Sequence, residues 1–372
     1  MDIISNLPEP VLYHILSFLS PTEALSTSTL SKTWLQIINS FTTNLEFDDK
    51  LSPGTDFASS VCQTLNRHTA DIRSVTLILS YPYEVEHTSP WIQAMEARNV
   101  QKVKVSGTHD NSFQQVHSYI KLDLSTFKTI PVLDVSGPIF VILPYSSYLP
   151  NLKILRLEIW RINYGVEDTI PKLLSSCPAL KELKLDYLTA VSMYSHKISV
   201  SSSVLQSFRL RFRDRRSKAD VFKIHLDVPC IESFDIELIW SMPYVTVIKP
   251  MPALREVKIA VVDAGAGSFL NLMSFLDAVS YVESLSLCAF ITKVLTSSSS
   301  TWRPFLPSIT KLEVGTDLTT ISPWLDCVPK LEKLVCIKEM EMQWHHYTPT
   351  TPPESTATST SATVKEIAGS QA

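Results

Sequence analysis

Residues 149–159 read LPNLKILRLEI, and residues 177–185 read CPALKELKL. Each stretch contains an apolar residue, two variable residues, a second apolar residue, one variable residue and a third apolar residue. The alternation at the end of this unit is typical of a β-strand with one buried face. In the first stretch the apolar positions are Leu152, Leu155 and Leu157, and in the second they are Leu180, Leu183 and Leu185.

Eleven copies of this repeat unit follow one another between residues 72 and 336. Their first positions, from 72 to 331, give ten intervals and a mean period of about 26 residues, which lies in the range of leucine-rich repeats. The other nine copies are Ile72/Val75/Leu77, Val100/Val103/Val105, Ile130/Leu133/Val135, Leu205/Phe208/Leu210, Ile231/Phe234/Ile236, Leu254/Val257/Ile259, Val282/Leu285/Leu287, Ile309/Leu312/Val314 and Leu331/Leu334/Cys336. This period predicts an α/β (α+β) repeat protein in which stacked units bury what one unit cannot.

Three segments between the copies have the apolar spacing of helices. They are residues 56–68, 166–178 and 268–281, and in the second of them Ile170, Leu173 and Leu174 share one helical face. We therefore expect each unit to be a short strand followed by a helix or a turn. Residues 41–340 are expected to form a curved leucine-rich-repeat solenoid with a parallel sheet on its concave face.

The N-terminal stretch NLPEPVLYHILSFL, residues 6–19, predicts a helix that begins at its prolines. Its apolar residues form two adjacent stripes, so the apolar arc is about half the helix and wider than that of an ordinary surface helix. One stripe holds Leu7, Val11, Ile15 and Phe18, and the other holds Leu12, Leu16 and Leu19. A further helix is expected around Trp34, Ile37 and Ile38. Residues 1–40 thus predict three short helices whose core needs a partner or the following domain.

The composition is that of a folded soluble protein, with 45% hydrophobic and 19% charged residues. A net charge of −4 gives no reason to expect binding to nucleic acid or to a membrane. Eight glycines and no glycine-rich phosphate-binding motif argue against a nucleotide-dependent enzyme. We expect no cofactor, and a location in the cytoplasm or nucleus, because the chain starts without a secretion signal. The scattered cysteines are expected to be reduced and packed as small apolar residues; they are Cys62, Cys177, Cys230, Cys288, Cys327 and Cys336.

The C-terminal residues 341–372 differ from the repeats. From residue 348 onward Thr, Ser, Pro and Ala dominate and no aromatic residue occurs. Such a composition buries too little apolar surface to offset the entropy of ordering, which predicts a disordered tail. His345 and His346 lack a nearby set of further metal ligands, so we interpret them as a surface pair.

The stretch LPEPVLYHILSFLSPTEALSTSTLSKTW, residues 7–34, resembles the F-box, specifically that of plant F-box proteins with leucine-rich repeats. LPNLKILRLEIW and CPALKELKL are similar to the repeats of the same family, and so is LEFDD at residues 45–49. LEKLVCIKEMEMQWHHYTP, residues 331–349, resembles the beginning of the FBD region found at the C-terminus of many such proteins. The resemblance divides the chain into an F-box (1–40), a repeat domain (41–340) and a degenerate FBD-like start with its tail (341–372).

The resemblance implies a non-catalytic substrate receptor of a Skp–cullin–F-box (SCF) ubiquitin ligase. The F-box would dock on a Skp-type adaptor, and through it on the cullin and RING core, while the repeats would hold a protein substrate. Matching the motif position by position gives the expected adaptor-facing residues Leu7, Pro8, Val11, Ile15, Leu19, Leu30 and Trp34. The alternative for these residues is that they form only the core of the helical segment.

Strand alternation gives the candidate substrate-binding face, because residues between the buried apolar positions point outward. The charged candidates are Lys104, Arg156, Glu158, Lys184, Asp186, Arg209, Arg211, Asp235 and Glu237. The alternative is that these residues are solvated or neutralise one another across neighbouring strands, Arg209 and Arg211 against Asp235 and Glu237. The basic run RLRFRDRRSK, residues 209–218, is either a loop after a strand or a site for a phosphate or an acidic segment.

Two alternatives to the ubiquitin-ligase role stay open at this point. The repeats could serve a scaffold or ligand sensor that is not coupled to degradation. The degenerate C-terminus is also compatible with a diverged copy that has lost its function. The sequence contains no nucleophile-elbow motif, so an enzyme is the least favoured interpretation.

Overall fold

The protein is described here by a computed structural model. It describes residues 4, 7–19, 27–41, 43–50, 55–68, 71–108, 120–162, 166–187, 197–212, 223–238, 244–247, 250–261, 273, 275–297, 305–316, 321–337 and 365–368. The chain divides into two compact units, Met1–Ser192 and Met193–Ala372. The division falls inside the predicted repeat domain, between its fifth and sixth copies.

The first unit begins with a small helical segment. It consists of α1 (Glu9–Ser17), the 3₁₀ turn η2 (Thr27–Thr29) and α3 (Lys32–Phe41). Pro8 caps α1 in an extended conformation and Pro10 lies in its first turn, where a missing N–H costs no hydrogen bond. The cluster that holds the segment together consists of Leu12, Leu16, Trp34, Ile37 and Ile38, with Leu7, Ile15 and Leu19 packed against it.

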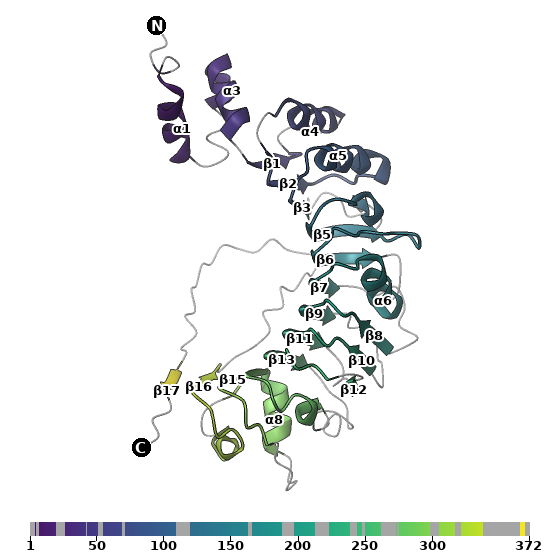
Figure 1. The fold of residues 1–372 in the computed structure, drawn as a ribbon, viewed down its shortest axis with the longest axis vertical. Coiled ribbons are helices and arrows are strands. Elements are labelled where there is room, and N and C mark those ends of the chain that lie inside the picture. Colours follow the sequence, from purple (N-terminus) through teal and green to yellow (C-terminus); the bar gives the residue numbers. More distant parts are fainter. Residues whose placement is uncertain are drawn as a thin grey trace, which may run out of the picture. The chain divides into compact units, whose positions relative to one another are not determined.

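The rest of the first unit is a parallel sheet with helices on one side (Figure 1). Its strands, in the order in which they pair, are β1 (Asn44–Asp48), β2 (Ser74–Leu79), β3 (Lys102–Gly107), β5 (Val132–Ile142), β6 (Ile154–Ile162) and β7 (Glu182–Tyr187). The short strand β4 (Ile120–Asp123) pairs with the second half of β5. The connections contain α4 (Thr55–Arg67), α5 (Val85–Ala97), the turn η3 (Leu124–Thr126) and α6 (Val166–Ser176). The helices predicted at 56–68 and 166–178 are therefore confirmed.

The second unit contains a main sheet and a second, smaller one. Five strand pairs of the main sheet are parallel, and its strands in order are β9 (Ser207–Phe212), β11 (Ser233–Leu238), β13 (Glu256–Val261), β14 (Ser284–Leu287), β15 (Lys311–Val314), β16 (Lys333–Cys336) and the antiparallel β17 (Lys365–Ala368). The smaller sheet is parallel and has the order β8 (Lys197–Ser201), β10 (Lys223–Asp227) and β12 (Tyr244–Val247). The remaining elements are α8 (Ala289–Ser297) and the turn η4 (Ser322–Cys327).

Two expectations differ from this architecture. The connections after β7, β9 and β11 contain the strands β8, β10 and β12 in place of a helix or turn, since Ile198, Val200, Ile224 and Leu226 are buried at alternate positions. In addition, Lys365–Ala368 form β17 inside the tail that we expected to be disordered, so this expectation is corrected for these four residues. Of the helix predicted at 268–281, residues 273 and 275–278 are helical, while residues 268–272 and 274 lie outside the described residues. Residues 341–364 and 369–372 of the tail also lie outside them.

All eleven copies of the repeat unit end in strands of the main sheets, as predicted. In the first ten copies every apolar position is buried, whereas Leu331 and Cys336 of the last copy are half-buried. Strand registers place equivalent residues side by side, for example Val75 beside Val103 and Leu155 beside Leu183. Each copy therefore completes the core of its neighbours, which explains why a single unit would not fold alone.

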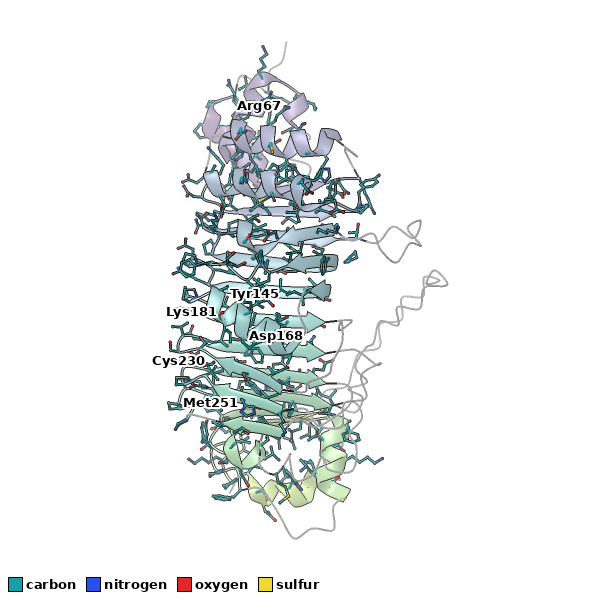
Figure 2. The ribbon with its side chains drawn as sticks, turned by 90° about the vertical axis from the view of Figure 1, so that its right-hand side faces the viewer. Arg67, Tyr145, Asp168, Lys181, Cys230 and Met251 are labelled. Carbon is teal, nitrogen blue, oxygen red and sulfur yellow. The ribbon has the colours of Figure 1, made fainter. Side chains whose placement is uncertain are left out.

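The turns that lead into the strands follow a rule that the apolar repeat pattern does not reveal. In six copies the N–H of the first apolar residue donates to the carbonyl three residues earlier, as Leu180 does to Cys177 at 3.1 Å. Proline follows the acceptor in five such turns and has the backbone dihedral that this turn position requires; these prolines are Pro150, Pro178, Pro229, Pro252 and Pro329. Figure 2 shows Cys230 and Met251, which belong to two of these turns, on the same side of their sheet.

A kink in β5 depends on glycine. The register between β5 and β6 shifts between Gly137 and Phe140, and Gly137 has a φ of +100°. A Cβ at this position would overlap the carbonyl oxygen of Gly107 on the neighbouring strand β3. Both the dihedral and the close approach therefore require glycine.

We predict that Gly137→Ala lowers the free energy of unfolding by about 1–3 kcal/mol, because it adds a steric overlap to an unfavourable dihedral. Urea denaturation of the full chain measures this change. Asp134→Ala on the same strand is the matched control and should change stability by less than about 0.5 kcal/mol. Equal stability of the two variants would contradict this account of the kink.

Candidate functional site

The helical segment exposes apolar side chains although it has its own core. Val11 is 42% exposed and Leu30 is 62% exposed, whereas Leu12 and Leu16 on the other stripe of α1 are 1% exposed. Exposed apolar side chains that cluster on a small segment are typical of a protein–protein contact. We call Ile4, Val11, Phe18 and Leu30 the exposed apolar set.

The structure sorts the predicted adaptor-facing residues into three groups. Pro8, Val11 and Leu30 are exposed, and Leu7, Ile15 and Leu19 are half-buried against the core. Trp34 is only 2% exposed and belongs to the core cluster. Trp34 thus belongs to the core of the segment in the unbound chain, which is the alternative that the sequence left open for it. For all seven residues an adaptor contact stays a prediction.

Phe18 was missed as a candidate site residue, although it is 75% exposed. It follows α1 directly and its ring contacts that of His14 edge-on, with centroids 4.8 Å apart. The sequence could have identified Phe18 as a candidate, because it follows Val11 by seven residues and residues seven apart lie on the same helical face.

The second candidate surface is the outward strand face, formed by the residues between the buried apolar positions. In the first unit, strand registers bring Lys104, Asp134, Arg156 and Lys184 into one row across β3, β5, β6 and β7. Ser106, Ser136, Glu158 and Asp186 form the neighbouring row. The predicted residues of this unit therefore lie on adjacent strands, as expected from alternation.

An ion-pair cluster occupies part of this face. Glu182, at the start of β7, accepts a hydrogen bond from Arg156 Nε at 2.8 Å and lies 2.8 Å from Lys184 Nζ. Burial alone would raise the pKa of the Glu182 carboxyl, but the hydrogen bonds and charges of Arg156 and Lys184 outweigh it and lower the pKa. Glu182 was missed because it precedes the L-x-L pattern by one residue, although alternation also points it outward.

The outward strand face of the second unit is neutralised by ion pairs between β9 and β11. Arg209 Nε lies 2.6 Å from Asp235 Oδ2, and Arg211 Nε lies 3.0 Å from Glu237 Oε2. The register pairs the same residues directly, which confirms the mutual neutralisation that the sequence suggested. Arg209 Nε also donates a hydrogen bond to Asp235, whereas Arg211 and Glu237 are held by charge alone. Residues 213–218 of the basic run lie outside the described residues.

Three charged residues on the outward strand face of the first unit are not neutralised by ion pairs of this kind. Lys104, Asp134 and Glu158 make no ion pair or side-chain hydrogen bond to another residue that the structure describes. Lys104 and Glu158 are also exposed. Charged groups that are exposed and not neutralised by neighbours are available to a partner, so these residues are the better candidates on the outward strand face.

A buried carboxylate supports the first turn of the repeat sheet. Asp49, which follows β1 in the LEFDD stretch, is fully buried and accepts hydrogen bonds from the N–H groups of Ser80 at 2.6 Å and Tyr81 at 3.2 Å. Burial and the Asp49 charge raise the pKa of the nearby Tyr83 hydroxyl. Asp49 therefore holds the backbone in place where the chain leaves β2. The apolar pattern of the strands does not predict this role.

The described residues contain no group of three or more His, Cys, Asp or Glu side chains that could hold a metal ion. In the same part of the chain no helix is long and apolar enough to cross a membrane. Burial raises the pKa of the Cys177 thiol to about 12 and also raises that of Cys288, so both thiols stay protonated. Cys177 is buried as expected and Cys288 donates to the Val261 carbonyl, whereas Cys230 is exposed, which corrects the expectation that it is packed.

Comparison with known proteins assigns both parts of the chain. The F-box domain matches residues 4–45, and the LRR repeats of FBD-associated F-box protein At5g56370 match residues 88–336, which is more than half of the chain. The chain belongs to the family of F-box proteins with FBD-associated leucine-rich repeats. The resemblance noted from the sequence is thereby confirmed.

Individual members of this family from Arabidopsis thaliana are similar over most of the chain. FBD-associated F-box protein At4g10400 is 28% identical over 77% of this chain and 66% of its own length. F-box protein At4g09920 is 29% identical over 77% of this chain and 87% of its own. F-box/FBD/LRR-repeat protein At4g26340 is 27% identical over 80% of this chain and 68% of its own.

F-box/LRR proteins are generally non-catalytic substrate adaptors of SCF ligases, and an F-box generally binds a Skp-type adaptor. In this F-box/LRR protein the matched F-box contains the exposed apolar set, and the matched repeats contain most of the outward strand face.

We predict that Glu182→Gln lowers the free energy of unfolding by about 1 kcal/mol at neutral pH, since the pairs with Arg156 and Lys184 are only partly buried. Because the pKa of Glu182 is lowered in the folded protein, its ion pairs contribute their full stabilisation at any pH above the ordinary glutamate pKa. It is lost as the pH falls below about 4 and the carboxylate is protonated. Urea denaturation of both proteins across this pH range measures the difference, with Glu158→Gln as the unpaired control. A difference that does not depend on pH would contradict the role of the ion pairs.

Proposed function

We propose that this protein is the substrate-recognition adaptor of an SCF ubiquitin ligase. The observation that carries the proposal is the pairing, in one chain, of an F-box that exposes apolar side chains and a repeat domain with unneutralised charges on its strands. In this role the F-box binds a Skp-type adaptor, which connects it to the cullin and RING core, and the repeats bind a protein substrate. The chain itself performs no covalent chemistry.

The F-box suits the adaptor role because its core and its contact surface are separate. Leu12, Leu16 and Trp34 hold the segment together, while Val11 and Leu30 stay exposed and can bury their surface against another chain. Burying such side chains contributes about 25 cal/mol per Å² of apolar area. A small set of apolar anchors is thus enough to provide the centre of a protein–protein contact.

The repeats suit the substrate role because their strands present side chains in fixed rows. Lys104 and Glu158 lie two strands apart on a rigid sheet, so a partner with complementary charges at this spacing needs no rearrangement of the sheet. Binding of both adaptor and substrate raises the effective concentration of substrate lysines near the conjugating enzyme. Ubiquitination of this kind, in the cytoplasm or nucleus, is the activity that we propose.

We predict that Val11→Asp weakens binding of the full chain to a Skp-type adaptor at least tenfold, because it places a charge in an apolar contact. Isothermal titration with the purified adaptor measures the dissociation constant. Val204→Asp is the matched control, because Val204 is also an exposed valine (37%) but lies in the repeats. Unchanged binding by Val11→Asp would overturn the assignment of this surface.

Trp34→Ala tests whether Trp34 acts through the core of the helical segment or by direct contact with the adaptor. We expect it to destabilise the helical segment by about 3–5 kcal/mol, as loss of a buried aromatic residue does. Adaptor binding would then fall together with helical structure, measured by circular dichroism. Weakened binding with unchanged structure and stability would show instead that Trp34 contacts the adaptor directly.

We predict that Lys104→Glu combined with Glu158→Lys prevents substrate turnover while adaptor binding persists. Quantitative proteomics would identify proteins that accumulate when this chain is depleted and decline when it is restored. The double variant should fail to restore the decline, whereas Lys153→Glu with Glu86→Lys, which lies off the strand face, should succeed. Proteins that bind the repeats but keep a constant half-life in all these cells would favour a scaffold or sensor.

A further inference from the structure

The last parallel strand of the second unit, β16, is covered on its outer edge. One edge pairs with β15, where Leu312 lies beside Leu334 and Val314 beside Cys336. The other edge pairs with β17, the segment Lys365–Ala368. Without β17 this edge would present unpaired backbone donors and acceptors, which are a template for any extended segment.

The direction of β17 sets it apart from the repeats. Strand pairs between successive copies are parallel in both units, whereas β17 runs antiparallel to β16. Residues 338–364 separate the two strands in the sequence. The pairing is therefore not a twelfth repeat but has the geometry of a peptide strand added to the edge of a sheet.

The register gives this edge a chemical preference. Ile367 pairs with Leu334, which is 6% exposed and ends the row of buried apolar residues in the main sheet. Glu366 pairs with Val335 and is diagonal to Lys333. An aliphatic residue beside Leu334, preceded by an acidic residue, therefore fits this edge, since apolar and opposite-charge neighbours stabilise strand pairs.

A pairing of four residues is short, and strand pairs of this size are marginal by themselves. A connection within one chain supplies an effective concentration on the order of millimolar, which favours the cis strand without making it irreplaceable. We propose that the edge of β16 is a docking site for an extended, antiparallel peptide segment. Lys365–Ala368 occupies the site in cis, and a partner segment with the sequence pattern acidic–aliphatic–small occupies it by displacing them.

The test uses the full chain and a fluorescent peptide ATVKEIAGS, which copies residues 362–370. Ile367→Pro in the protein removes a backbone donor from the cis strand and should release the edge. We expect this variant to bind the peptide at least tenfold more tightly than the unchanged protein, measured by fluorescence anisotropy. Ala357→Pro, a proline in the same tail outside β17, should behave like the unchanged protein.

A second peptide with Asp in place of Ile should not bind to any of these proteins, because the register partner of Leu334 is then charged. Hydrogen exchange provides an independent readout, in which the amides of residues 334 and 336 lose protection in Ile367→Pro but not in Ala357→Pro. The amide of Lys333 donates to Thr310 on the other side of β16 and should stay protected in both variants. Equal peptide affinities for all three proteins, or unchanged protection in Ile367→Pro, would overturn the proposal. A concentration-dependent dimer of the unchanged protein that Ile367→Pro abolishes would also overturn it, by showing that the edge receives the strand of a second copy.

Discussion

The repeat region depends on parallel pairing between successive copies of one unit. A strand of four to six residues buries little by itself, and its backbone groups are satisfied only by its neighbours. The register places Phe208 beside Phe234, and Val257 beside Leu285, so apolar residues from separate repeats form continuous rows. Turns with proline at a fixed position lead five of the copies into this register. Stability is thus nearly a sum of contacts between neighbours, which makes the ends of each sheet its weakest parts.

The helical segment follows a different physical rule. Among its described side chains the core cluster holds five buried residues, which is small for a segment of this length. Such a segment cannot cover all its apolar side chains, and Val11, Phe18 and Leu30 stay exposed. Their exposure is a cost for the isolated chain and a source of binding free energy once a partner covers them. Because the segment is too small to bury all its apolar side chains, the same side chains that reduce its stability are available to bind an adaptor.

Charges on the outward strand face divide according to their neighbours. Where adjacent strands carry opposite charges at equal register, as Arg209 and Asp235 do, the side chains neutralise one another and stabilise the sheet. Equal register alone does not make an ion pair: Lys104 lies beside Asp134, but no ion pair joins the two among the described residues. Glu158 lies beside Ser136 and Asp186, neither of which is a counter-charge, so both charges stay available for recognition. A list of outward residues therefore overstates the binding surface, since several of them already have partners within the protein.

The sequence by itself determined the repeat, its period and the strand that ends each of the eleven copies, because a buried apolar pattern that recurs eleven times has few other physical solutions. It also determined the F-box, through a dense and ordered local motif. The strands β8, β10 and β12 and the pairing of β17 could not be predicted, because short alternating segments are ambiguous until a neighbouring edge selects them. Only the tertiary structure decided that Trp34 is covered and that Glu182 pairs with Arg156 and Lys184. Burial and ion pairing depend on which residues from distant parts of the chain become neighbours, and one-dimensional periodicity contains no such information.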